Sequence, residues 1–373
     1  MKMKNIIKKQ QKTIFIGFMS VALFIICICT VCTAYAADKD NAKTPVDIPG
    51  LTYDHSMELS YAEEFSVDYY NDGYALITID QEGQFLVVPE GKKAPKGLEK
   101  DITVIQQPLN NIYLVATSAM DLFRAIDGID SIRLSGTQEN GWYIQEAKDA
   151  MESGKMIYAG KYNAPDYELI LNEGCGLAIE STMIHHNPEV EEKLEQFGIP
   201  VMVERSSYES HPLGRTEWMK LYAVLLGKED VAEKAFKEQT DKLDKVLTSD
   251  DKDTGKTVAF FYINSTGAVN VRKNGDYVSN MIELAGGSYA LDDAQTASTS
   301  GSSVTLEMER FYATAKDADI IVYNGTIDES VATLNDFVGK TRYCRSSKRE
   351  ERQRLGHKRR HVPADDFYRR HYR

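Results

Sequence analysis

The chain contains little cysteine, and its cysteines do not form a pattern that would staple a small domain. Five occur in 373 residues, and Cys27, Cys29 and Cys32 lie within an apolar segment near the N-terminus. Only Cys175 and Cys344 remain beyond that segment, which is too few for a disulfide framework. A chain of this length with 42% hydrophobic residues can instead bury two cores. The composition therefore predicts two globular lobes.

Familiar catalytic signatures are also missing from the sequence. It contains no G-x-S-x-G nucleophile elbow, no P-loop, no H-E-x-x-H motif and no dinucleotide fingerprint. We therefore expect a protein that is not an enzyme and uses no cofactor. An exported hydrolase with an unfamiliar site is the alternative from a different functional class.

Positive charge is scarce before residue 340. The net charge is −12, but residues 340–373 carry 13 Lys and Arg against 4 Asp and Glu, a local charge of +9 that leaves −21 for the rest. An acidic body is a poor polyanion binder, so we expect no nucleic-acid partner. The basic segment 340–373 has no apolar period, so we expect it to be disordered and not a native part of the fold. The second lobe would then be incomplete. A nucleic-acid or membrane-binding tail is the alternative.

The first 36 residues resemble an export signal. Five lysines occur in the first twelve residues, residues 13–31 carry no charge, and Ala34, Tyr35 and Ala36 form a small-x-small cleavage site. The apolar stretch approaches the length that spans a bilayer, so a retained N-terminal anchor is the alternative. Lipidation is less favoured, because Ile26, Ile28 and Val31 precede the cysteines where a small residue is usual. We expect an exported protein, periplasmic or on the outer face of the cell membrane.

Hydrophobic patterning divides the remaining chain into further segments. Residues 37–111 form a linker and a β-hairpin region, because apolar and polar residues alternate on either side of a turn at 81–83 within residues 73–88. Residues 214–248 lack strand signals and show helical spacing, which predicts one long helix or two helices interrupted near Gly227.

Apolar runs and amphipathic stretches alternate on both sides of that helix, which predicts α/β lobes with largely parallel sheets. The segments are 112–116, 120–126, 131–134, 142–150, 156–158, 167–171, 177–179, 190–197 and 200–203 in an N-terminal lobe (112–213), and 257–263, 277–285, 306–315 and 319–323 in a C-terminal lobe (249–339). The predicted fold is α/β, with two Rossmann-like lobes joined by a long helix and an N-terminal β-hairpin appendage.

Several short motifs between Ile112 and Gly339 resemble a known family. They are Gly160-Lys161-Tyr162 followed by residues 165–171 and the strand 177–180, then Gly198-Ile199-Pro200-Val201, Leu225-Leu226-Gly227, Ala285-Gly286-Gly287, and Ala318-Asp319 before an apolar strand. Their order and spacing resemble the substrate-binding proteins of iron-siderophore and cobalamin ABC importers, the class III or helical-backbone periplasmic binding proteins. Cys175-Gly176 stands where the family commonly has Pro-Asp.

This resemblance implies a monomer that holds a metal-chelate small molecule, such as an iron-siderophore, haem or cobalamin-like complex, between its lobes. It also implies an ABC permease and its ATPase as partners, with membrane association only through the N-terminal segment or the permease. One glutamate on each lobe docks onto permease arginines in this family. The lobe-one motif assigns this role to Glu168, and the lobe-two motif to Glu309, with Glu307 as the alternative.

Ligand-binding residues are expected in loops after the strands, where open α/β sheets present ligands. The candidates are Trp142, Tyr143, Met183, His185, His186, Arg205, Tyr208, His211, Arg215, Asn264 and Arg272. Aromatic faces and arginines suit a flat or anionic chelate. Direct metal-ion or oxyanion binding is the alternative, because His185, His186 and His211 are possible ligands. Adjacent histidines normally point apart, however, so no protein-bound metal is expected.

Overall fold

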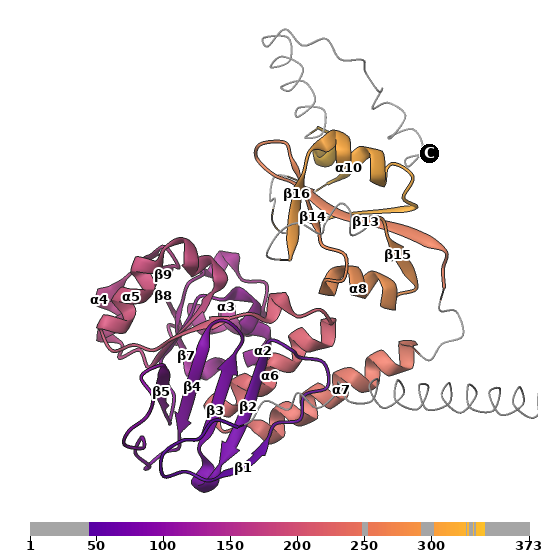
Figure 1. The fold of residues 1–373 in the computed structure, drawn as a ribbon. Helices are drawn as coiled ribbons and strands as arrows, with labels where there is room; N and C mark the ends of the chain where they lie inside the picture. Colours follow the sequence, from indigo (N-terminus) through magenta and orange to yellow (C-terminus); the bar gives the residue numbers. More distant parts are fainter. Residues whose placement is uncertain are drawn as a thin grey trace, which may run out of the picture. The chain divides into compact units, whose positions relative to one another are not determined.

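The computed structural model describes residues 45–247, 253–291, 302–325, 327, 331 and 333–339 (Figure 1). The predicted signal segment 1–36 and the basic segment 340–373 lie outside these residues. Within the described part of the chain, no helix is both long and apolar enough to cross a membrane.

The N-terminal region forms a five-stranded sheet in the order β1-β2-β3-β4-β5. The strands are β1 (Tyr53–Ser56), β2 (Phe65–Tyr70), β3 (Ala75–Ile79), β4 (Gly83–Val88) and β5 (Ile102–Gln106). Strands β3 and β4 make the expected hairpin, whose turn places Gln81 at a positive φ of 61°. The first four strands pair antiparallel, and β5 adds in parallel to β4.

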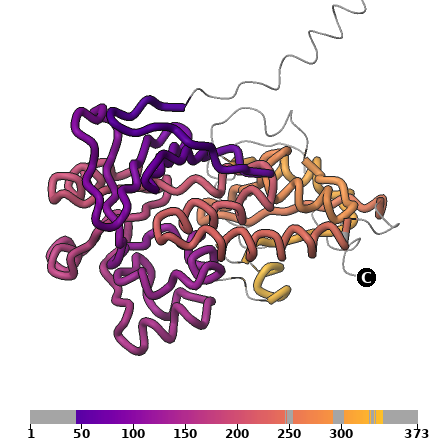
Figure 2. Tube along the Cα trace, turned by 90° about the horizontal axis from the view of Figure 1, so that it is seen from below, coloured from indigo at the N-terminus to yellow at the C-terminus, as the bar shows by residue number. Residues whose placement is uncertain are grey.

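This sheet is more than the expected appendage, because it shares a core with the lobe that follows. Phe65 on β2 packs edge-on against Trp218 of helix α6 (Pro212–Leu226), with ring centroids 5.0 Å apart. Buried residues of the sheet belong to one hydrophobic cluster with α6 and with the sheet of lobe one. The sheet and α6 lie side by side in both views (Figures 1 and 2). The apolar face of its alternating strands is buried against this helix.

Lobe one is the predicted parallel α/β unit. Its sheet has the order β12-β11-β6-β7-β8, and every pairing is parallel. The strands are β6 (Ile112–Leu114), β7 (Ile132–Ser135), β8 (Ile157–Tyr158), β11 (Leu177–Ser181) and β12 (Val201–Glu204), and the helices are α2 (Met120–Ala125), α3 (Gln145–Glu152), α4 (Tyr167–Asn172) and α5 (Pro188–Gln196). A small hairpin joins β9 (Gly160–Lys161) to β10 (Ala164–Pro165).

The segment that connects the lobes, predicted as one long helix or as two helices interrupted near Gly227, consists of two helices. Helix α6 ends at Gly227, which adopts a left-handed conformation with φ 63° and ψ 41° that glycine tolerates best. Helix α7 (Glu229–Leu247) begins directly afterwards with acidic residues in its first turn. Most of α6 is buried, which explains why its sequence is apolar on every side.

Lobe two is a mixed sheet rather than a purely parallel one. Its elements are β13 (Lys256–Ile263), β14 (Val269–Arg272), α8 (Tyr277–Leu284), β15 (Gly287–Tyr289), β16 (Ser303–Leu306), α10 (Met308–Ala315) and β17 (Ile320–Tyr323). Strands β15 and β17 pair in parallel with β13, whereas β14 pairs antiparallel with both β13 and β16. Residues 334–339 are helical, and Phe337 packs against Tyr323 in the core of the lobe.

Candidate ligand-binding site

The loop after β7 holds two neighbouring aromatic candidates in opposite environments. Trp142 is only 5% exposed, and its indole N–H donates to the Ser135 hydroxyl at 3.2 Å. Tyr143 is 89% exposed. Trp142 is thus buried in the core of lobe one and has little surface that a ligand could contact. The Tyr143 ring is accessible to a ligand.

The short helix η5 (Thr182–His186) after β11 carries Met183, His185 and His186, all of which are exposed. His185 Nε2 lies 3.3 Å from a carboxylate oxygen of Glu82, which comes from the turn between β3 and β4. Among the described residues, no group of three or more His, Cys, Asp or Glu is arranged to hold a metal ion.

Arg205, after β12, is paired within the protein. It is 7% exposed; its Nε donates to Glu64 at 2.7 Å and its Nη1 to Glu82 at 3.3 Å. The guanidinium also stacks over the Tyr208 ring at 4.3 Å. Both carboxylates come from the N-terminal sheet, more than a hundred residues away in sequence. Two carboxylates therefore already compensate the charge of Arg205.

His211 caps helix α6. Its Nδ1 accepts a hydrogen bond from the Leu213 backbone N–H at 3.1 Å, and its ring stacks on Tyr61 with centroids 4.5 Å apart. Burial lowers the pKa of His211, which favours the neutral ring that this acceptor role requires. In this arrangement the histidine orders the start of α6.

Two buried glutamates that the sequence did not single out fix the N-terminal segment to α6. The Glu217 carboxylate accepts backbone N–H groups of residues 60–62 at 2.8–3.1 Å and pairs with Lys220 at 3.2 Å. Glu209 accepts those of Glu63 and Glu64 at 2.8 and 3.1 Å, as well as the Trp218 indole N–H. These bonds hold the entry to β2 against the helix.

Residues from both lobes meet where α8 contacts α6. The guanidinium carbon of Arg215, on α6, lies 4.1 Å from the ring centre of Tyr277, the first residue of α8. The guanidinium carbon of Arg272, at the end of β14, lies 4.7 Å from the same ring centre. Nearby, the side-chain amide of Asn280 donates to the Ser210 carbonyl at 2.7 Å. The structure thus brings together Arg215 and Arg272, two of the predicted ligand residues.

Asn264, the remaining lobe-two candidate, organises a turn. Its side-chain oxygen accepts the backbone N–H groups of Thr266 and Ala268, both at 3.0 Å. The same oxygen also accepts the Thr266 hydroxyl at 2.7 Å. This set of bonds shapes the connection between β13 and β14, and it occupies the side-chain oxygen of Asn264.

The predicted docking glutamates occupy equivalent positions in the two lobes. Glu168 is the second residue of α4, and Glu309 is the second residue of α10. Both are exposed. Glu307 is also exposed but precedes α10 as its N-cap. The helix register therefore relates Glu309, rather than Glu307, to Glu168.

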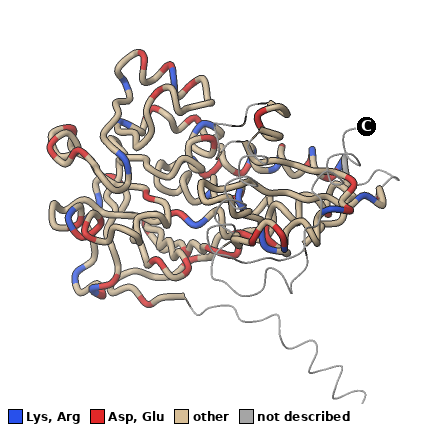
Figure 3. Tube along the Cα trace, turned by 90° about the horizontal axis from the view of Figure 1, so that it is seen from above, with Lys and Arg blue, Asp and Glu red and all other residues tan. Residues whose placement is uncertain are grey.

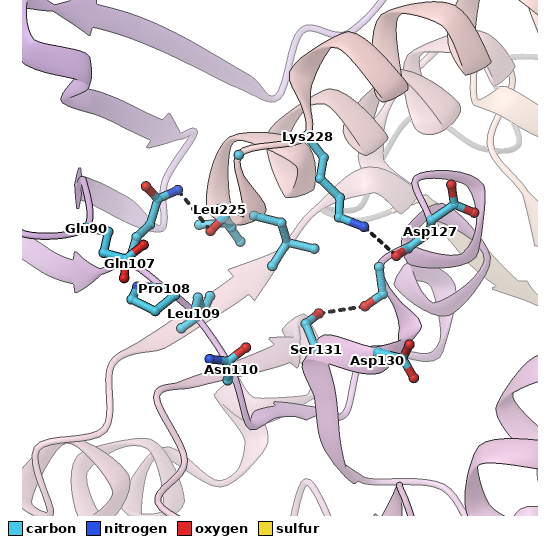
Figure 4. A pocket seen from close by; sticks show the side chains of 13 residues that line it. Glu90, Gln107, Pro108, Leu109, Asn110, Asp127, Asp130, Ser131, Leu225 and Lys228 are labelled. Carbon is cyan, nitrogen blue, oxygen red and sulfur yellow. Dashed lines mark hydrogen bonds between the residues drawn. The ribbon is translucent and has the colours of Figure 1, made fainter.

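A separate cavity of about 490 Å³ lies at the other end of the lobe-one strands (Figure 4). Leu109 and Asn110 precede β6, and Ser131 precedes β7, so these lining residues approach the strand starts rather than the loops described above. The amide of Gln107 closes one side by donating to the Val224 and Leu225 carbonyls at the end of α6. Lys228 closes another by donating to the Asp127 carbonyl at 2.6 Å. None of the predicted site residues lines this cavity.

Charge is dispersed over the described chain. Figure 3 shows acidic residues on both lobes with basic residues interspersed among them. The local pairings therefore decide which cations a ligand could meet. Arg205 is neutralised by the N-terminal sheet, whereas no carboxylate of the described residues forms an ion pair with Arg215.

Comparisons with known proteins place this geometry in context. Residues 116–347 match the model of a family described as periplasmic binding protein, a match that runs past Gly339 into the basic segment. The structure of the periplasmic haem-binding protein HutB of Vibrio cholerae is similar, with 16% identity, a TM-score of 0.48, and coverage of 62% of this chain and 82% of that one. Staphylococcus aureus SirA, solved with staphyloferrin B, has 17% identity, a TM-score of 0.45, and coverage of 63% and 76%.

Two uncharacterized lipoproteins of Methanocaldococcus jannaschii are similar along more of the sequence. One is 24% identical over 352 residues, covering 86% of this chain and 81% of its own length. The other is 23% identical over 317 residues, covering 78% and 77%. Residues 116–373 make up a smaller share of this chain than either match covers. Both matches therefore also include part of the region that forms the N-terminal sheet.

Proposed function

Because this chain belongs to the periplasmic binding protein family, we propose that it is the extracytoplasmic solute-binding component of an ABC importer. It captures an iron-siderophore, haem or cobalamin-like complex between its lobes and delivers it to the permease as a monomer. The contact of Arg215 and Arg272 with Tyr277 supports this proposal, because a binding protein of two lobes needs ligand groups from each. The similar lipoproteins of M. jannaschii favour an extracytoplasmic location.

Burial and pairing refine the set of ligand residues. Tyr143 and Met183 are exposed, and Arg215 lacks an ion pair among the described residues, so these side chains remain available. Trp142 and Arg205 are occupied by internal contacts. We therefore assign ligand contact to the exposed aromatic and thioether groups of lobe one and to the arginines beside Tyr277.

A thermal-shift and calorimetric screen tests the binding function. At least one ferric siderophore, haem or a corrinoid should raise the melting temperature, because a ligand that binds only the folded state stabilises it. A response to free divalent ions or simple oxyanions, with none to these complexes, would favour the alternative of direct ion binding. Turnover of generic ester or phosphate substrates would favour a hydrolase.

Docking to the permease is tested by charge reversal. Glu168→Lys combined with Glu309→Lys should abolish uptake while leaving ligand affinity unchanged, because both side chains lie on exposed helix starts. Glu168→Lys with Glu307→Lys is the matched control and should retain more uptake. Loss of ligand binding in the first double variant, or equal loss of uptake in both, would contradict the assignment.

A further inference from the structure

The basic side chains near the lobe contact differ in how much of their charge is already neutralised. Arg205 is held by Glu64 and Glu82, and Glu82 also faces His185. Arg215 has no ion pair among the described residues. Arg272 bonds Asp276 through Nε. Carboxylates thus contact Arg205, His185 and Arg272, whereas Arg215 has no ion pair among the described residues. Arg272 has only one such carboxylate and uses a single N–H group for it.

Both of these arginines have an unmet hydrogen-bond donor. Arg215 Nε and Arg272 Nη2 are buried and have no hydrogen-bond partner in the part of the chain that the structure describes. Buried guanidinium N–H groups nearly always find an acceptor, because leaving them unpaired carries the full desolvation penalty. The Tyr277 ring offers both groups its π-face but supplies no lone pair in their plane. The described residues therefore supply no acceptor for either of these donors.

The nearby carboxylates do not supply these acceptors. Asp276 Oδ1 accepts the Val278 and Ser279 backbone N–H groups at 2.9 and 3.0 Å, so this carboxylate divides its charge between Arg272 and the start of α8. Glu204 accepts the Ser118 hydroxyl at 2.9 Å and the Ser206 N–H at 3.0 Å. Among the described residues, these carboxylates therefore leave Arg215 Nε and Arg272 Nη2 without an acceptor.

The two arginines are close enough for one compact ligand to reach both. Each guanidinium carbon lies less than 5 Å from the same ring centre. They are therefore at most about 9 Å apart, within the reach of a single chelate that stacks on or displaces the tyrosine. A carboxylate forms a bidentate pair with a guanidinium, which is stronger and more directional than stacking on a ring.

We infer that the solute is a carboxylate-bearing chelate whose anionic groups are bound by Arg215 from lobe one and Arg272 from lobe two. This inference rests on the proposed function, since it specifies the chemical class of the solute at that site. It excludes neutral hydroxamate chelates as the preferred ligands, because they carry no free oxyanion that would satisfy the two unmet donors.

Calorimetry on the full chain with defined probes tests this inference. The probes are ferric citrate, citrate without iron and the neutral ferric complex of acetohydroxamate. We expect ferric citrate to bind, and Arg215→Gln and Arg272→Gln each to weaken that binding at least about tenfold. Arg215→Lys should recover part of the loss, because it restores the charge without the planar fork. Arg124→Gln, which alters an exposed arginine paired with Asp121, is the control.

The outcomes separate this inference from the function on which it rests. Tighter binding of ferric citrate than of free citrate, lost in Arg215→Gln with the melting temperature retained, supports it. Binding of the neutral hydroxamate chelate in preference to ferric citrate overturns the inference but leaves the proposed function standing. An affinity for ferric citrate that does not depend on Arg215 also overturns it. Failure of every chelate to bind overturns both.

Discussion

Glu180 should make lobe one less stable as the pH rises, because the fold buries its carboxyl group without a partner. The residue lies on β11 and is 0% exposed, and neither side-chain oxygen has a hydrogen-bond partner among the residues that the structure describes. Burial, with a smaller contribution from the Glu191 carboxylate, raises the pKa of Glu180 from 4.5 to about 8. The folded protein therefore keeps this proton at neutral pH, whereas the unfolded chain releases it.

The sign and size of the effect follow from proton linkage. Between pH 4.5 and about 8 the folded state binds one more proton than the unfolded state, so the free energy of unfolding falls as the pH rises. The limiting slope is about 1.4 kcal/mol per pH unit. From pH 5 to pH 7.5 this amounts to about 3 kcal/mol, an order-of-magnitude figure. The contribution of Glu180 is fully present below its unfolded pKa and lost as the pH rises through the folded one.

Glu180→Gln isolates this effect, since glutamine has the shape of the neutral acid and does not titrate. Urea unfolding at several pH values, followed by tryptophan fluorescence, is suitable because Trp142 and Trp218 both belong to the cluster that includes lobe one. The stability of the variant relative to the unchanged protein should increase from pH 5 to pH 7.5. If the difference in the free energy of unfolding between the variant and the unchanged protein is the same at every pH, the reasoning is refuted. Glu152→Gln, on the exposed end of α3, should show only such a constant difference.

Two further predictions concern the backbone near the site. Glu217→Ala should lower the free energy of unfolding by about 1–3 kcal/mol in urea titrations, because the part-buried N–H groups of Tyr61 and Ala62 lose their acceptor and Lys220 keeps only Glu233. Gly160→Ala should cost about 2–3 kcal/mol in the same assay, since φ is +91° and a Cβ would lie 2.3 Å from the Ala164 carbonyl oxygen. Gly154→Ala, with φ +72° and open space, should cost about 1 kcal/mol or less; equal losses would contradict this account.

Periodicity predicted the parallel lobe well because its strands are short, buried runs separated by amphipathic helices. Every predicted segment from 112 to 203 corresponds to a strand or helix of lobe one. Lobe two was predicted less completely. Strands β14 and β16 are only four residues each, and β16 buries a single residue, so they carry a weak signal. The antiparallel pairing of β16 with β14 depends on contacts between segments distant in sequence.

The site was harder to predict, because residue type does not show which charges are already paired. Arg205 and Arg215 both follow β12 and looked equivalent as ligand candidates. Glu64 and Glu82 neutralise the first, and they lie in a sheet whose packing on lobe one the sequence did not indicate. Tyr277, the ring between Arg215 and Arg272, was read only as part of a helix.

The N-terminal sheet contributes carboxylates to the loops of the proposed site as well as side chains to the core. The family match begins at residue 116, after the last strand of this sheet, so Glu64 and Glu82 lie outside the matched region. Both carboxylates reach loops that follow strands β11 and β12, and they remove one arginine and one histidine from those available to an anion. Cations left unpaired by this sheet are the ones that can select a ligand. If the proposed site binds an anion, the specificity of this chain depends in part on residues that lie outside the family's own region.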